Sequence, residues 1–372
     1  MYIENYIDEQ YMGTSASKSH KNKISDFTLV KIPEDYGMLK IASYNVNLRN
    51  TVNIDLKIKE IISYLNSSHK NKSLDVISIQ GIYDSASLYI LIKDFKKYCF
   101  KHRIDVHFAP NFDYIDTEAS GEHLISSKKM LDLSLHSSGD NGKNSTKRKI
   151  VQNIIISKHP IISTVYSELD DYTDMDDILG IQTVIGANIL INKKIISIYN
   201  TNLSKDIKSA NIINRKVRKT ELSSLFDSVE TNMKSLDGDK FKKYKKSDIH
   251  LLCGTFNISE IDDNNINDEF TEFIQLHHCI DIFRYLYDSD PGYTTSYMER
   301  SSYMFLHLTK DMYDDKSEFS KKLQNVKEIS DLFNIIFKRY NIHFLDYSII
   351  KNENTKVATY YPIECVFIFK IK

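Results

Sequence analysis

Polar residues that could hold a phosphate or a water molecule stand at the ends of two short apolar runs. The run 249–253 leads into Gly254-Thr255-Phe256-Asn257, and the run 39–46 carries Asn45 near its end. Such runs predict buried strands, and sheet proteins usually place their chemistry at strand ends. The two asparagines could bind a ligand through their amides, but a strand-end asparagine more often caps backbone groups.

The elements that must position these residues alternate between β-branched runs and helical stretches, which is typical of a layered α/β protein. Helices are predicted where apolar residues recur at three- and four-residue intervals, over 55–65, 85–99 and 207–234. Strands are predicted over 39–46, 75–80, 105–109, 151–157, 183–191, 194–200, 249–253 and 365–372. The ends of several strands must meet if the polar residues form one site.

A single domain over 37–372 is expected to follow a flexible polar arm, 1–36, which contains too little apolar material to fold alone. The 41% of hydrophobic residues is enough for a substantial core. The four cysteines lack the spacing of a zinc site or a disulfide framework, so we expect reduced core residues. Insertions are predicted at about 126–149, 235–247 and 310–340.

The charges of the chain nearly cancel, because 49 Lys and Arg residues face 50 Asp and Glu residues. The whole chain therefore offers no general field for nucleic acid or acidic membranes, and such a contact must come from a local patch. No apolar run reaches the length of a membrane span, and the first residues do not resemble a signal peptide. We expect an intracellular protein, cytoplasmic or nuclear, without a membrane span.

Six ordered motifs resemble those of the endonuclease/exonuclease/phosphatase superfamily, whose fold is DNase I-like. They are IASYNV at 41–46, DVISIQG at 75–81, ISKHPI at 156–161, YNTNL at 199–203, GTFN at 254–257 and ATYYPI at 358–363. The resemblance covers about 39–372. It implies a four-layered α/β sandwich, in which two mixed, mostly antiparallel sheets pack together between helices.

Active members of this superfamily hydrolyse phosphate esters with an in-line water, and the resemblance assigns each polar group a duty. A Glu and an Asn hold Mg²⁺, an Asp–His pair acts as base and orienter, another Asp positions the nucleophile, and an earlier His contacts the phosphate. Here Asn45 and Asn257 keep the family residue types. Gly81 occupies the place of the Glu, and Asn202 occupies that of the earlier His. Thr255 stands in the place of the positioning Asp, and Thr359 and Tyr360 stand in the places of the Asp–His pair.

The missing groups argue against catalysis of the family's kind. Losing one base or one nucleophile-positioning group removes several orders of magnitude in rate, and groups that act together do not replace one another. Without the Glu, only two neutral amides remain to draw Mg²⁺ out of water. We therefore expect no metal or other cofactor, and Mg²⁺ belongs to an alternative in which the carboxylates have moved.

Candidate carboxylates keep that alternative open. Asp84 could replace the missing metal ligand, although its place before an apolar helix fits an N-cap better. Glu364 could be a displaced base, although we expect a solvated surface position for it. Asp262 and Asp263 are further candidates. A divergent Mg²⁺-dependent phosphodiesterase or nuclease needs two such groups within metal reach of the retained asparagines.

Lysine-rich loops could contact polyanions. Lys242, Lys243 and Lys245 alternate with aromatic residues, and Lys147 and Arg148 lie in another polar stretch. Such runs are more often solvated loops, so a nucleic-acid-binding protein that does not cleave is a further alternative. The preferred hypothesis is a catalytically degenerate, non-enzymatic protein that serves as a binding or scaffolding module, with a protein as its expected partner.

Overall fold

The computed structural model divides the chain into two units, Met1–Asp35 and Tyr36–Lys372, and every element below belongs to the second. The predicted arm, most of the predicted helix 55–65 and the insertions 126–149 and 310–340 lie outside the described residues. The residues that the structure describes are 35–48, 59, 62–63, 74–82, 85–109, 153–169, 182–205, 215–238, 241–244, 249–258, 269–287, 294–295, 300–308, 342–350 and 360–371.

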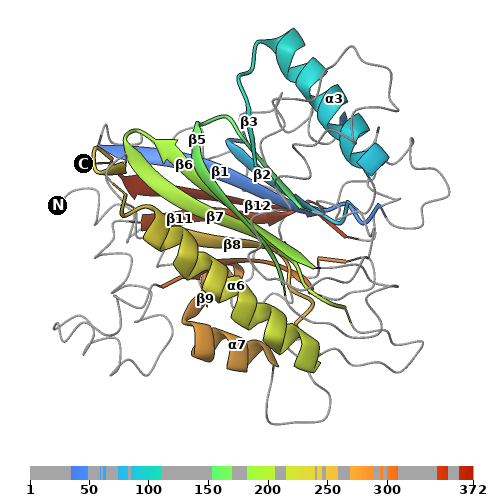
Figure 1. Cartoon of the computed structure of the whole chain (residues 1–372), viewed down its shortest axis with the longest axis vertical. Helices are drawn as coiled ribbons and strands as arrows, with labels where there is room; N and C mark the ends of the chain where they lie inside the picture. Colours follow the sequence, from blue (N-terminus) through green and yellow to red (C-terminus); the bar gives the residue numbers. More distant parts are fainter. Residues whose placement is uncertain are drawn as a thin grey trace, which may run out of the picture. The chain divides into compact units, whose positions relative to one another are not determined.

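Two six-stranded sheets form the centre of this unit (Figure 1). Sheet A has the strand order β11-β12-β1-β2-β4-β3. Neighbouring strands in this sheet run antiparallel, except that β1 and β2 are parallel. Its strands are β1 (Tyr36–Asn45), β2 (Val76–Gln80), β3 (His107–Ala109), β4 (Ile154–Ser157), β11 (Ile342–Ile349) and β12 (Ile363–Lys370).

Sheet B has the order β5-β6-β7-β8-β10-β9 and likewise contains one parallel pair, β7 and β8. The strands of sheet B are β5 (Ile161–Glu168), β6 (Thr183–Ile191), β7 (Lys194–Asn202), β8 (His250–Thr255), β9 (Cys279–Asp281) and β10 (Ser302–His307). The parallel pair of each sheet matters for function because the carboxyl ends of its two strands lie at the same edge of the sheet.

Helices cover the outer faces of the two sheets, as Figure 1 shows. Helix α3 (Ser85–His102) packs its apolar face on sheet A, whereas α6 (Arg215–Ser235) and α7 (Glu269–His277) pack on sheet B. A short helix, α8 (Ile282–Leu286), follows β9. The largest apolar cluster contains strand residues of both sheets, so it fills the space between them. The predicted four-layered α/β sandwich is confirmed.

Strand alternation explains how the polar motif residues come to lie between the sheets. Ile41 of β1 belongs to the cluster between the sheets, whereas Tyr44 packs on the α3 side. Because successive side chains of a strand point to opposite faces, Asn45 shares the inner face with Ile41. The same alternation puts Asn202 and Thr255 on the inner face of sheet B. The inner layer is therefore apolar along most of its length and polar at the ends of the parallel strands.

The structure corrects several of the predicted elements. Strands β5, β9, β10 and β11 and helices α7 and α8 were absent from the sequence prediction. Strand β12 begins at Ile363 instead of 365, and β3 begins at His107 instead of 105. The edge strand β5 is half-buried along nearly all its length, so it lacks the alternation that marks a strand in a sequence.

The predicted reduced cysteines are confirmed, since all four are free and buried. No helix in the described ranges combines the length and the hydropathy needed to cross a membrane.

Candidate functional site

The candidate site lies where the carboxyl ends of the two parallel strand pairs face each other across the sheet interface. In sheet A, Asn45 of β1 pairs in register with Gln80 of β2. In sheet B, Asn202 of β7 pairs in register with Thr255 of β8. All four side chains are buried. The fold therefore brings together residues that are more than 150 positions apart in the chain.

Asn45 is the centre of the site. Its Nδ2 donates a hydrogen bond of 2.8 Å to Thr255 Oγ1 and lies 3.5 Å from Asn202 Oδ1. Its Oδ1 accepts a hydrogen bond of 3.0 Å from the backbone N–H of Asn47. Both ends of the Asn45 amide are thus engaged within the protein. The three motif residues form a neutral network of amides and a hydroxyl that joins the two sheets.

Gly81 closes the sheet A side of this network. Its φ of 76° lies in the left-handed region, which L side chains rarely adopt. A Cβ atom at this position would meet Asn45 Oδ1 at 2.5 Å and the backbone nitrogen of Asn47 at 2.8 Å. The Asn45 amide therefore occupies the space that any larger residue at 81 would need. A glutamate, which the resemblance implies for this position, does not fit this arrangement.

A second pair of buried amides lies one step deeper between the sheets. Gln80 Nε2 donates to Asn200 Oδ1 at 2.6 Å, and Asn200 Nδ2 donates to the carbonyl oxygens of Ile79 and Ile154 at 2.9 Å each. Gln80 Nε2 also lies 3.0 Å from Ser43 Oγ. Sequence reasoning assigned no role to Asn200. The signal was available, because an asparagine that alternates with isoleucines along a strand must face the core.

The loop after Asn202 is held by charged groups on α6. The N–H and hydroxyl of Ser204 donate to the Glu221 carboxylate at 2.9 and 2.5 Å. The buried Arg218 guanidinium donates to the Ser204 carbonyl oxygen at 3.1 Å and makes two 2.7 Å bonds with Glu269 of α7. This chain of contacts fixes the backbone that positions Asn202 without placing a charge on the inner network.

Asn257 and Tyr360 are two further motif residues, and each has contacts outside the Asn45–Thr255 pair. Asn257 Nδ2 donates to the Leu203 carbonyl oxygen at 2.6 Å, and its buried Oδ1 has no partner among the described residues. This contact is the backbone capping that the sequence favours for a strand-end asparagine. Tyr360 is buried and forms an isolated β-bridge with Thr295. The distance from Lys205 Nζ to the centroid of the Tyr360 ring is 5.6 Å. Its partner in the motif, Thr359, lies outside the described residues.

Glu364 does not reach the site, and the expectation of a solvated position for it is wrong. Its neighbours Ile363 and Cys365 face the cluster between the sheets, so its own side chain points to the outer face. There it is nearly buried and forms an ion pair of 2.9 Å with Lys40 of the adjacent strand β1. The cross-strand lysine neutralises the carboxylate, which explains its burial. Asp84, Asp262 and Asp263 lie outside the described residues.

The donor set of the network does not suit Mg²⁺, which prefers carboxylate and other hard oxygen ligands. The Asn45 amide is satisfied within the protein, and Gly81 has no side chain. The described part of the chain contains no group of three His, Cys, Asp or Glu residues that could hold a metal ion. The described residues of this site therefore do not fit a bound Mg²⁺ ion.

Two of the five residues predicted to bind polyanions lie among the described residues. Lys242 and Lys243 are exposed in the turn 241–244 after α6, whereas Lys245, Lys147 and Arg148 lie outside the described residues. Phe241 is buried against Ile195, so it is a core residue. Lys243 Nζ lies 4.9 Å from the ring centroid of Tyr244. The buried aromatic of this loop is therefore not available to stack on a base.

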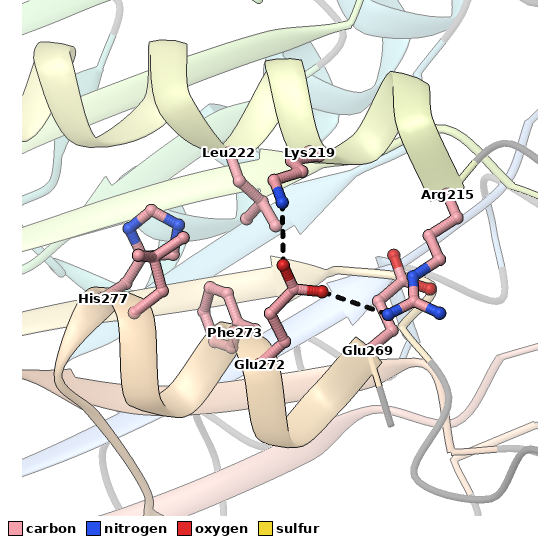
Figure 2. Close-up of a pocket in the computed structure, with 8 residues that line it drawn as sticks. Arg215, Lys219, Leu222, Glu269, Glu272, Phe273 and His277 are labelled. Carbon is pink, nitrogen blue, oxygen red and sulfur yellow. Dashed lines mark hydrogen bonds and ion pairs between the residues drawn. The ribbon is translucent and has the colours of Figure 1, made fainter. Parts of the chain in front are cut away.

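A groove between α6 and α7 is the second feature of note (Figure 2). Figure 2 shows Arg215 and Lys219 of α6 reaching toward Glu272 of α7, with N–O distances of 3.0 and 2.8 Å. These pairs hold the pKa of the Glu272 carboxyl below its usual value, through hydrogen bonds from Lys219 first and Arg215 second. Apolar side chains complete the lining, namely Leu222, Phe273 and Leu276.

Comparison with known proteins gives structural likeness only. No family model and no curated protein matches this chain. Its structure resembles endonuclease/exonuclease/phosphatase proteins. One from Leptotrichia buccalis is 13% identical with a TM-score of 0.48, over 88% of this chain and 98% of that chain. The human Nocturnin catalytic domain is 12% identical with a TM-score of 0.47, over 90% and 97%.

A beta toxin of Staphylococcus aureus is 15% identical with a TM-score of 0.49, over 88% of this chain and 99% of that chain. These likenesses concern the course of the chain. The chemistry of the site rests on its own residues, which supply amides, a hydroxyl and a glycine.

Proposed function

We propose that this chain is a non-catalytic protein on an endonuclease/exonuclease/phosphatase-like scaffold, which acts as a binding or scaffolding module for a protein partner. The observation that carries the proposal is the 2.8 Å hydrogen bond from Asn45 to Thr255, made across the sheet interface by two buried side chains. Where hydrolases of this superfamily need an open, charged cleft, this chain has a filled and neutral contact.

The chemistry of the network supports this proposal. A general base must exchange a proton near neutral pH, and neither an amide nor a threonine hydroxyl does so unaided. A metal-bound or activated water needs anionic ligands or a base beside it, and Asn45, Asn202 and Thr255 supply neither. The contribution of the three residues is to cross-link the sheets.

The α6–α7 groove supports a protein as the partner. Leu276 is 58% exposed at its edge, above an apolar lining that includes Leu222 and Phe273. Ion pairs of Glu272 with Arg215 and Lys219 form a polar border. An apolar centre with a polar rim is the arrangement that protein interfaces use. The groove fits an apolar side chain of a partner that approaches between the two helices.

The catalytic part of the proposal is tested by calorimetry with Mg²⁺ and Mn²⁺, together with hydrolysis of bis(p-nitrophenyl) phosphate and of single-stranded RNA. We expect no binding tighter than roughly millimolar, the level set by neutral amide ligands, and no turnover. Turnover that disappears in Asn45→Ala would overturn the proposal, because it would require relocated carboxylates acting beside this residue.

The binding part is tested with a photo-crosslinking amino acid at position 276, in the full chain expressed in cells. The matched position is Lys234, which is exposed near the far end of α6 and pairs with Glu230. We expect a discrete crosslinked protein from position 276 that is absent from position 234. The same pattern of products from both positions would contradict a partner at the groove.

A further inference from the structure

The outer face of α3 combines basic side chains with one exposed aromatic ring. The inner face of the helix, which includes Leu91, Phe95 and Cys99, packs on sheet A. The outer face repeats with helical spacing and carries Lys93, Lys97, Phe100 and Lys101, with Lys96 at its edge, where Lys96 Nζ lies 5.2 Å from the ring centroid of Phe108 of sheet A. These five residues, with Arg103 in the following turn, are here called the basic face.

Charge is concentrated on this face although the chain as a whole has a net charge of −1. Between 85 and 105 the only carboxylates are Asp94 and Asp105, against four lysines and Arg103. Lys97, Lys101 and Arg103 are exposed. With a rise of 1.5 Å per residue, the lysines extend over about 12 Å of the helix. The basic face is therefore a local patch of the kind that a near-neutral chain needs in order to attract a polyanion.

Phe100 lies in the middle of these charges and is 87% exposed. One exposed aromatic ring alone needs no explanation, but a ring set among lysines matches what single-stranded nucleic acid requires. Lysines neutralise the phosphates of the strand, and an unpaired base stacks on the ring. The buried Phe241 of the lysine-rich turn 241–244 offers no such surface.

We propose that the basic face of α3 binds single-stranded nucleic acid without sequence preference, through phosphates on its lysines and a base stacked on Phe100. An anionic membrane is the weaker candidate, because a helix that binds a bilayer buries an apolar face in it. The apolar face of α3 already packs on sheet A, which leaves Phe100 alone for insertion. This binding surface is separate from the strand-end network, and it stands or falls independently of the proposed function.

The test is fluorescence anisotropy of a labelled 12-nucleotide oligouridylate with the full chain, titrated at several salt concentrations between 50 and 200 mM. We expect Lys97→Gln/Lys101→Gln to weaken binding and to reduce the slope of log K against log salt by about 1.4, which corresponds to two single-strand phosphate contacts. Phe100→Ala, which leaves the charges in place, should weaken binding about 5- to 100-fold through loss of one stacked base.

The matched control is Lys216→Gln/Lys234→Gln, which removes the same charge from exposed positions of α6. This variant should bind the oligonucleotide within about twofold of the original chain, because charges outside the binding surface are largely screened by salt. All substituted side chains are at least partly exposed, and circular dichroism verifies that each variant is folded.

Three results overturn the proposal. One is an equal loss of affinity in the control variant, which would show a general charge effect. Another is unchanged binding in Phe100→Ala, which would show that no base stacks on the Phe100 ring. The third is binding to phosphatidylserine vesicles that exceeds binding to the oligonucleotide and is lost in Phe100→Ala, which would identify a membrane surface instead.

Discussion

At the scale of single residues, Gly81 is held in a conformation and a space that only glycine satisfies. We expect Gly81→Ala to lower the free energy of unfolding by at least about 2 kcal/mol, because a side chain at positive φ is strained. The new Cβ would also lie 2.5 Å from Asn45 Oδ1, so the central amide must shift. Urea unfolding of the purified chain measures the loss.

Gly238→Ala is the matched control for this substitution. The nearest atom to a Cβ at 238 is the Ser235 carbonyl oxygen at 3.8 Å, an ordinary contact distance. The free energy of unfolding should change by no more than about 0.5 kcal/mol. Equal effects of the two substitutions would show that the network around residue 81 is looser than described.

Thr255 offers a direct test of how neutral the network must be. We expect Thr255→Val to cost about 1–3 kcal/mol, since Asn45 Nδ2 loses its 2.8 Å acceptor. Thr255→Asp should cost more, roughly 3–5 kcal/mol at pH 8, because it buries a carboxylate beside the neutral Asn45 amide and Ser302 hydroxyl.

The two Thr255 variants also differ in their dependence on pH. Burial raises the pKa of the introduced carboxyl above its unfolded value of about 3.9, so the folded state holds the proton over a pH range in which the unfolded state has lost it. The stability of Thr255→Asp therefore falls as pH rises through that range, while Thr255→Val follows the original chain. Thermal unfolding at pH 5 and pH 8 measures the gap, and a gap that does not narrow at pH 5 contradicts burial of the carboxylate.

The residues of this site differ in how far the sequence predicted them. The six motifs predicted that Asn45, Asn202 and Thr255 would meet, since each follows an apolar run that forms a strand. They did not predict that Asn45 would bond to Thr255, because a contact between the two sheets depends on how the sheets pack. The burial of Glu364 was also missed, since its pairing with Lys40 depends on strand register.

At the scale of elements, Arg218 ties α6 to α7 and to the loop after β7. We expect Arg218→Met to lower the free energy of unfolding by roughly 3–5 kcal/mol, because the largely buried Glu269 carboxylate loses its cation. Hydrogen exchange of the backbone at Ser204 should rise, since its carbonyl oxygen and neighbouring contacts depend on this guanidinium. Urea unfolding and exchange measured by mass spectrometry give the two readouts.

Arg215→Met on the same helix is the control for Arg218→Met. Its ion pair with Glu272 is more than a third exposed on both sides, and Glu272 keeps Lys219 as a second partner. Exposed pairs contribute about 1 kcal/mol or less. Losses of equal size in the two variants would show that burial of the Arg218 network does not determine its effect.

Elements with strong periodicity were predictable, and short or edge elements were not. The predicted strands 39–46 and 183–191 match β1 and β6 closely, because both are apolar over most of their length. Strand β9 has three residues and α8 has five, which is too short for a period to appear. Their places are set by tertiary contacts, such as the buried ion pair of 2.7 Å between Asp281 and Arg300.

At the scale of the whole molecule, buried histidines make stability sensitive to acid. Burial, and secondarily the charge of His307, lowers the pKa of His250 to about 3. Burial likewise lowers the pKa of His277 and of His307 to about 4. The unfolded chain therefore binds protons below pH 6.5 that the folded chain does not bind, and stability is lost as pH falls from about 6.5 toward these values.

His250 alone should account for a loss of about 2 kcal/mol between pH 7 and pH 5. We expect His250→Leu to remove that part of the pH dependence while changing stability at pH 7 little, because His250 Nδ1 has no hydrogen-bond partner among the described residues. Urea unfolding at both pH values measures the difference. An unchanged loss in the variant would mean that His250 is protonated without unfolding.

The fit between Gly81 and Asn45 also constrains how this sequence can vary. A side chain gained at 81 would contact the Asn45 amide before it could contact any ligand, so neither position can change freely while the other is kept. We expect relatives with a larger residue at 81 to place the side chain of residue 45 elsewhere. In this chain a single substitution at 81 therefore does not create a metal ligand, because the new side chain needs the space that the Asn45 amide fills.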